Sequence, residues 1–99
     1  MAVSLAQHIE ITPGVKGGRP RITGRRITVH NIVIWHERMG LSADEIASAH
    51  DLGLADIYAA LAYYYDHRAE IDEELRSDDA LVDELRRNMP SKLISKLNA

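Results

Sequence analysis

Alternating hydrophobic and polar positions indicate that the first thirty residues are extended. Ile9 and Ile11 are separated by a polar residue, which places both on one face of a short strand. Pro13-Gly14 is a turn signal, and the branched hydrophobic residues of 21–29 flank Thr23-Gly24. The pattern therefore predicts a short N-terminal β-arm whose second part folds back over a glycine turn.

Hydrophobic positions recur at helical spacing from about residue 30. The β-branched run in this stretch also suits a strand, but the glycine that follows it is typical of a helix end. The spacing thus predicts a first helix that Gly40 terminates and that has one hydrophobic face, made of Ile32, Val33, His36 and Met39.

The next helix has the strongest start signal in the chain. Ser42 and Glu45 stand in the positions of a capping box, in which each side chain accepts a hydrogen bond from the backbone N–H of the other residue. This helix is expected to bury Ile46 and to run to about His50, and residues 51–53 then break it. A long third helix follows, and its expected buried face is Leu54, Ile57, Leu61, Tyr64 or Tyr65, Arg68, Ile71 and Leu75.

The second and third helices have the spacing of a helix-turn-helix. Their turn contains Gly53, with Leu52 and Leu54 beside it as expected core anchors, and Ala49 stands where a close helix crossing needs a small side chain. An ordinary αα-corner uses the same chemistry, so the pattern leaves both open. In either case the sequence predicts two helices that meet at a short turn.

The third helix is poorly suited to reading DNA by itself. Asp56 lies in its first turn, and no Lys or Arg precedes Arg68, so DNA phosphates would be repelled. Ser42 and Tyr58 are the uncharged residues of the two helices that we expect could still contact DNA.

The end of the chain carries one more amphipathic segment. Ser77 and the two aspartates after it predict a fresh N-cap, and Pro90 a stop. The hydrophobic stripe is long for a body this small, so it either packs back on the long helix or binds in the groove of a partner. Its members are Leu81, Val82, Leu85, Met89, Leu93, Ile94 and Leu97.

Composition describes one small folded domain with an uneven charge. The 99 residues are 45% hydrophobic and 27% charged, with a net charge of −3 that argues against nucleic acid. Residues 1–40, however, carry six basic side chains and two acidic ones, residues 41–76 two and nine, and residues 77–99 four and four. The negative total therefore conceals a basic N-terminal third.

Five of these cations lie within eleven residues, and we call residues 16–26 the basic segment. Its glycines and Gly18-Arg19-Pro20-Arg21 resemble the extended arms that lie in the minor groove of DNA. The alternative is that the cations pair with the protein's own acidic helix. The predicted DNA contacts are Lys16, Arg19, Arg21, Arg25 and Arg26; if all met phosphates in a dimer, log K would fall against log salt with a slope of roughly −9.

Catalysis, metals and membranes find little support in the sequence. Cysteine is absent, and the five histidines have no ligand spacing, since Gly40 stands at the last position of an H-E-x-x-H motif begun by His36-Glu37. We therefore expect no enzyme, no cofactor and no metal. No hydrophobic run approaches the ~20 residues of a membrane span, and the N-terminus does not resemble a signal peptide, so a cytoplasmic protein is expected.

The chain resembles the domain-of-unknown-function 433 family, a family of VapB-like antitoxins. The likeness covers about residues 9–71 and is most specific in Gly18–Val29, where many members have Thr at the position of Arg25. The resemblance implies a homeodomain-like or winged helix-turn-helix fold with an N-terminal β-arm, and a dimer. It further implies a PIN-like ribonuclease toxin as partner and the operon's own promoter as operator DNA.

The sequence and the resemblance together predict a mainly α protein with a short N-terminal β-arm and three or four helices. Residues 1–77 are expected to bind DNA and to dimerise, and residues 78–99 to form the partner-binding tail. The expected function is that of an antitoxin of a type II toxin–antitoxin pair. Two alternatives remain, a toxin-binding module with little DNA affinity and a free-standing transcription regulator.

Overall fold

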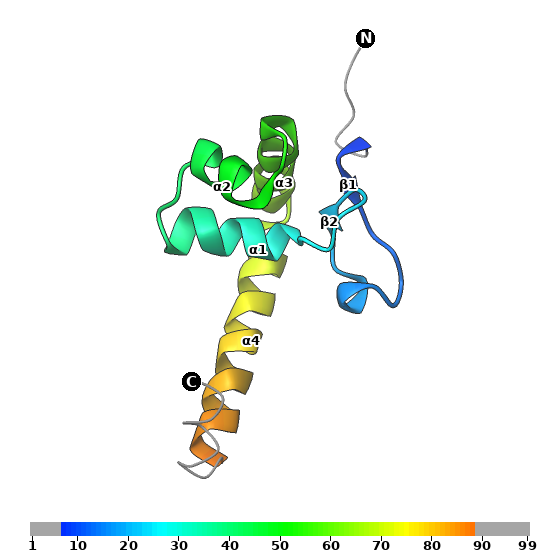
Figure 1. Ribbon diagram of the computed structural model, residues 1–99. Helices are drawn as coiled ribbons and strands as arrows, with labels where there is room; N and C mark the ends of the chain where they lie inside the picture. The colour runs from blue at the N-terminus through cyan, green and yellow to red at the C-terminus, as the bar shows by residue number, and fades with distance from the viewer. Residues whose placement is uncertain (1–6, 89–99) are drawn as a thin grey trace. The chain divides into compact units, whose positions relative to one another are not determined.

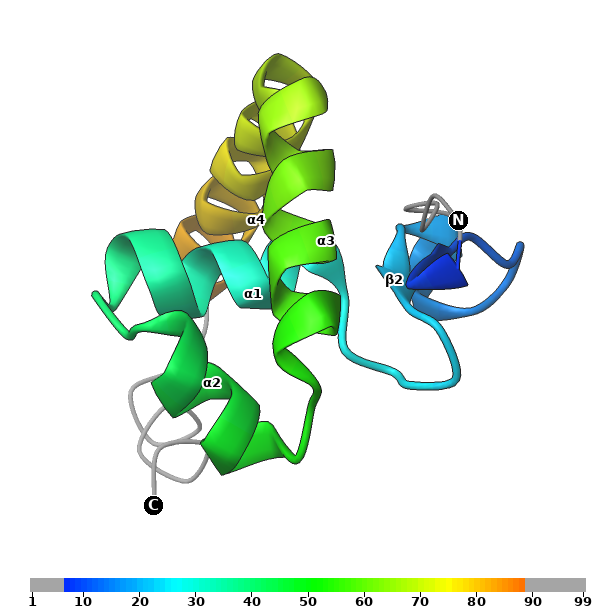
Figure 2. The same cartoon turned by 90° about the horizontal axis from the view of Figure 1, so that it is seen from above.

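The computed structural model describes residues 7–88, which fall into two compact units. Up to Arg68, a two-stranded hairpin precedes three helical segments (Figures 1 and 2). The second unit starts at Ala69 and holds most of one long helix. The bounds are β1 Ile9–Glu10, η2 Lys16–Gly18, β2 Arg21–Ile22, α1 Val29–Val33, η3 Ile34–Arg38, α2 Ala43–His50, α3 Leu54–Asp66 and α4 Arg68–Asn88.

The hairpin pairs β1 with β2 in antiparallel register, with Ile9 opposite Ile22. The chain then turns at Thr23-Gly24 and returns, so that the Ile22 N–H donates to the Ile27 carbonyl at 2.9 Å. The predicted glycine turn is thus present. The expectation that Ile9 and Ile11 lie on one face of the same strand is wrong, because β1 ends at Glu10 and Ile11 lies beyond it, 56% exposed.

The first helix begins at a capping box that the sequence reading missed. The Asn31 N–H donates to the Thr28 hydroxyl, and the Thr28 N–H donates to the Asn31 side chain. The α1 residues Ile32 and Val33 are buried as expected, but Met39 is 61% exposed. That part of the prediction is wrong because α1 runs into η3, a π-helical turn that takes in one more residue and so rotates later side chains off the buried face.

The α2–α3 pair follows the predicted pattern closely. The capping box is present, with the Glu45 N–H 3.1 Å from the Ser42 hydroxyl and the Ser42 N–H 3.1 Å from the Glu45 carboxylate. Ile46 is buried, and α2 ends where Asp51 adopts a left-handed conformation. Three residues then lead to α3, so the two helices meet at a short turn.

Two of the expected contacts at this turn are wrong. Leu52 is buried, but Leu54 is 42% exposed, because it opens α3 on the side away from the core. Ala49 is also exposed, so it does not mark the place where the helices cross. In α3 the small residues Ala59 and Ala60 are buried, which lets this helix pack closely against its neighbours.

The chain after α3 also differs from the sequence prediction. The expected long helix ends at Asp66, because His67 adopts a non-helical backbone conformation. Ser77 is no N-cap: it lies inside α4, which runs without a break from Arg68 to Asn88. Ile71 and Leu75 are buried as predicted, whereas Arg68 is exposed. The periodicity placed the helical residues correctly but not the break.

The Tyr65 hydroxyl donates a hydrogen bond to the Glu37 carboxylate at 2.8 Å. From this contact we predict how the stability of the protein depends on pH. The hydrogen bond raises the pKa of Tyr65, and the negative charge of Glu37 adds to the effect. A raised pKa in the folded state contributes stability below the ordinary tyrosine pKa of about 10, and that contribution is lost as the pH rises above it. Glu37→Gln should therefore lower the pKa of Tyr65 in an absorbance titration of tyrosinate, with Tyr65→Phe identifying the signal. An unchanged titration in Glu37→Gln would exclude the contact.

Candidate nucleic-acid interface

The basic segment does not present all its cations to solvent. Arg21 lies in β2 with a side chain only 11% exposed, and its guanidinium is 2.7 Å from the Glu10 carboxylate. The same group donates to the Arg25 carbonyl at 2.8 Å and to the Thr12 hydroxyl at 3.0 Å. Arg21 therefore ties the hairpin together, and its charge is largely balanced by the carboxylate beside it.

Arg25 reaches from the hairpin turn to the C-terminal end of α2. Its two terminal nitrogens donate to the His50 carbonyl at 2.7 Å and to the Asp51 carbonyl at 2.8 Å. These carbonyls lie where a helix leaves its acceptors unsatisfied and carries partial negative charge, which a cation stabilises. Next to them the His50 ring stacks on Trp35, with the ring centroids 3.8 Å apart. Arg25 is thus a structural link between the basic segment and the turn after α2.

Lys16 and Arg26 are the exposed cations of the basic segment. Neither side chain makes a hydrogen bond or ion pair with another residue of the range 7–88. Lys16 also has a positive φ of 50° and is followed by two glycines with positive φ, which lets the loop turn sharply. These two side chains have the exposure that phosphate contacts require.

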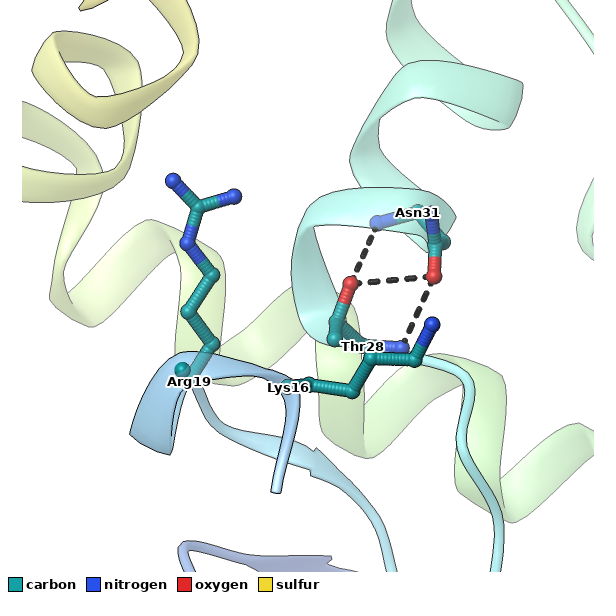
Figure 3. A pocket seen from close by; sticks show the side chains of 5 residues that line it. Lys16, Arg19, Thr28 and Asn31 are labelled. Carbon is teal, nitrogen blue, oxygen red and sulfur yellow. Dashed lines mark hydrogen bonds between the residues drawn. The ribbon is translucent and has the colours of Figure 1, made fainter. Parts of the chain in front are cut away.

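Lys16 and Arg19 also line an open pocket of about 450 Å³ together with Gly17, Thr28 and Asn31. Figure 3 shows the two cations extending from the loop around η2, and the Thr28–Asn31 capping pair at the start of α1. Thr28 and Asn31 were missed as site residues from the sequence. A threonine three residues before an asparagine, ahead of a hydrophobic run, could have indicated them. The pocket combines positive charge with polar groups held in place by the capping box.

The α2 and α3 residues expected to contact DNA have different environments. The Ser42 hydroxyl serves the α2 capping box. Tyr58 is 59% exposed, on a helix whose first turn carries Asp56. The Asp56 carboxylate faces His8 at 3.0 Å and also accepts the Gly53 N–H at 3.3 Å. The outward side of α3 therefore has no cation that could offset a phosphate charge.

The stripe expected to bind a partner lies partly within the described residues. Leu81, Val82 and Leu85 of α4 are 56%, 46% and 49% exposed, which is high for large hydrophobic side chains on one helix. The remaining stripe residues Met89, Leu93, Ile94 and Leu97 lie outside the described residues.

Within residues 7–88, no group of three or more His, Asp or Glu side chains is placed to hold a metal ion. None of the helices in this range is both long and hydrophobic enough to cross a membrane.

The fold and the basic segment define a small, mainly helical protein with a short N-terminal hairpin, and its relatives are consistent with this class. A family model described as "Protein of unknown function (DUF433)" matches residues 9–64, and the chain belongs to this family. The crystal structure of a DUF433 member protein from Anabaena variabilis ATCC 29413 is 36% identical, with a TM-score of 0.66 over 73% of this chain and 71% of that one. No curated protein matches.

Proposed function

We propose that this protein is the antitoxin of a type II toxin–antitoxin pair, a homodimer that binds its own promoter DNA and neutralises a PIN-like ribonuclease. The observation that carries the proposal is that the two candidate surfaces belong to different compact units. The exposed cations Lys16 and Arg26 belong to the first unit, and the exposed hydrophobic residues of α4 to the second. A protein that has to bind DNA and another protein at once needs two such surfaces.

In this proposal α1, α2 and α3 form a homeodomain-like helix-turn-helix with the β1–β2 hairpin as its arm. The three-residue turn between α2 and α3 supports it. The arm, and not α3, supplies the cations that contact DNA, because α3 contains no Lys or Arg. The pocket beside Lys16 is where we place a DNA phosphate, since an exposed lysine in an open pocket favours an anion.

Because Arg21 and Arg25 are bonded within the fold, fewer cations are available to DNA phosphates and the expected salt dependence is weaker. If Lys16 and Arg26 of two protomers meet four phosphates, log K should fall against log salt with a slope of roughly −4, well short of the −9 for five cations. Lys16→Gln or Arg26→Gln should each reduce the steepness by about 2, since a dimer loses two contacts. Anisotropy titrations of the upstream promoter fragment at several salt concentrations measure both quantities.

The matched control for this titration is Arg87→Gln, which removes the same charge from the exposed end of α4. It should leave the slope unchanged. Equal slopes for the wild type, Arg26→Gln and Lys16→Gln would mean that the basic segment does not touch DNA.

One observation favours the alternative of a toxin-binding module with little DNA affinity. Arg21 and Arg25 are engaged within the fold, by Glu10 and by the end of α2, so part of the basic segment serves structure. Under this alternative the promoter fragment binds no better than unrelated DNA, while the partner is still bound. The same titration therefore separates the two candidate functions.

A further inference from the structure

The outward side of α3 is a continuous uncharged stripe. Leu54, Tyr58 and Tyr65 are 42%, 59% and 55% exposed, and Ala62 between them is half-buried. At 3.6 residues per turn these four positions fall on one side of the helix, with the buried Ala60 opposite them and the buried Ile57 and Tyr64 along one flank. We call them the α3 stripe. It extends along a helix of 13 residues, or about 20 Å.

The chemistry of the α3 stripe resembles the centre of a protein interface. Tyrosine is enriched in such centres and charged residues are depleted. The Tyr65 ring is already held by its hydrogen bond to Glu37, so little side-chain freedom would be lost on binding. DNA does not suit this surface, because no cation lies on it.

The α3 stripe is complementary to a second copy of itself in antiparallel orientation. When two α3 helices lie side by side about a twofold axis near residue 60, Tyr58 of each faces Ala62 of the other, a large side chain against a small one. Leu54 then lies near Tyr65 of the second copy. A twofold contact brings identical patches together, so a charged stripe would repel itself, whereas the four side chains of this stripe are uncharged.

The charge at the end of α3 fits the same arrangement. Asp66 is exposed at the C-terminal end of the helix, and no basic residue lies in that last turn, so its carboxylate is unfavourably placed against its own helix dipole. In the antiparallel pair Asp66 lies beside the N-terminus of the other α3, near Leu54, where the helix dipole favours a negative charge. The twofold axis produces this contact twice. The Asp56 carboxylate of that first turn is itself held by His8 and by the Gly53 N–H.

We propose that the α3 stripe is the surface through which two copies of this chain form a homodimer. The assignment rests on the homodimer of the proposed function and names its interface. It directs the two α3 helices toward each other, so that the basic segments and not α3 contact DNA.

Sedimentation equilibrium of the full chain without DNA tests this surface. The wild type should be a dimer at micromolar concentration. Tyr58→Glu places two like charges at the centre of the interface and should raise the dimer dissociation constant at least about thirtyfold, as expected for a central tyrosine. Asp66→Asn should raise it by a smaller factor.

Ser48→Glu is the matched control, since it adds the same charge to an exposed position of α2. It should remain as dimeric as the wild type. If Tyr58→Glu loses helical circular dichroism, Leu54→Ser replaces it as the test, with the same expected direction. A Tyr58→Glu protein that dimerises like the wild type overturns the surface but not the homodimer. A monomeric wild type overturns both, and the DNA and toxin titrations then decide the rest of the proposed function.

Discussion

Arg25→Ala is expected to lower the free energy of unfolding by about 2 kcal/mol, although Arg25 lies in a segment whose charges suggest DNA contact. The substitution removes two charge-assisted hydrogen bonds, to the His50 and Asp51 carbonyls. The carbonyls at the end of α2 then lack these donors. In a domain of this size such a change lowers Tm by about 8–16 °C. Arg25→Lys should fall between, because one ammonium group cannot reach both carbonyls in the same forked geometry.

The neighbouring Arg26 provides the control. Its side chain is exposed and makes no hydrogen bond or ion pair within residues 7–88, so Arg26→Ala should change the free energy of unfolding by less than about 0.5 kcal/mol. Urea unfolding followed by the fluorescence of Trp35 measures both variants, because this single tryptophan stacks on His50 beside the contact. Equal stabilities for Arg25→Ala and Arg26→Ala would show that the link to α2 contributes nothing.

The second large effect concerns the hydrophobic residues of α4. Combined replacement of Leu81, Val82 and Leu85 by Ala should weaken binding of the ribonuclease by at least about a hundredfold, because the loss of three large side chains from an interface is worth several kcal/mol. Alanine keeps the helix propensity of α4, so the helix itself should persist. The measurement is a titration against the small nuclease encoded in the adjoining reading frame, with its RNA cleavage as a second readout.

Asp83→Ala combined with Arg87→Ala is the matched control for α4. These two residues lie on the side of the helix away from the hydrophobic stripe, and their joint replacement leaves the net charge unchanged. Binding and neutralisation should be retained. An adjoining frame that encodes no nuclease, or a nuclease bound equally well by the alanine variant of the stripe, would contradict the toxin-binding role of α4.

The local elements of the fold were predictable from the sequence. The Ser42–Glu45 capping box, the break at residues 51–53 and the burial of Ile46 and Ile57 depend on neighbours within a few residues, and the structure confirms them. The errors in predicting local elements arise where two local rules favour different structures for the same residues. Ser77 has the pattern of an N-cap but lies in the middle of α4, because the strong helix formers before it, and Ala80 and Leu81 after the two aspartates, continue the helix through it.

The candidate site was predictable only in part. The sequence located a cluster of cations in residues 16–26, but it predicted all five equally as DNA contacts. Which of them are exposed depends on groups far along the chain, since Arg25 bonds to carbonyls 25 and 26 residues away. A long guanidinium side chain can reach any of several acceptors, so its partner is set only when the hairpin and α2 come together.

The sequence by itself determined the β-arm, the helices up to α3 and a basic segment hidden under a net charge of −3. Periodicity, caps and turn residues act within one or two helical turns, and charge can be counted along the chain. The tertiary structure decided that Arg21 and Arg25 hold the fold together, that Lys16 and Arg26 are exposed, and that the α3 stripe is open. Those outcomes depend on which surfaces meet across long stretches of chain, and no local rule contains that information.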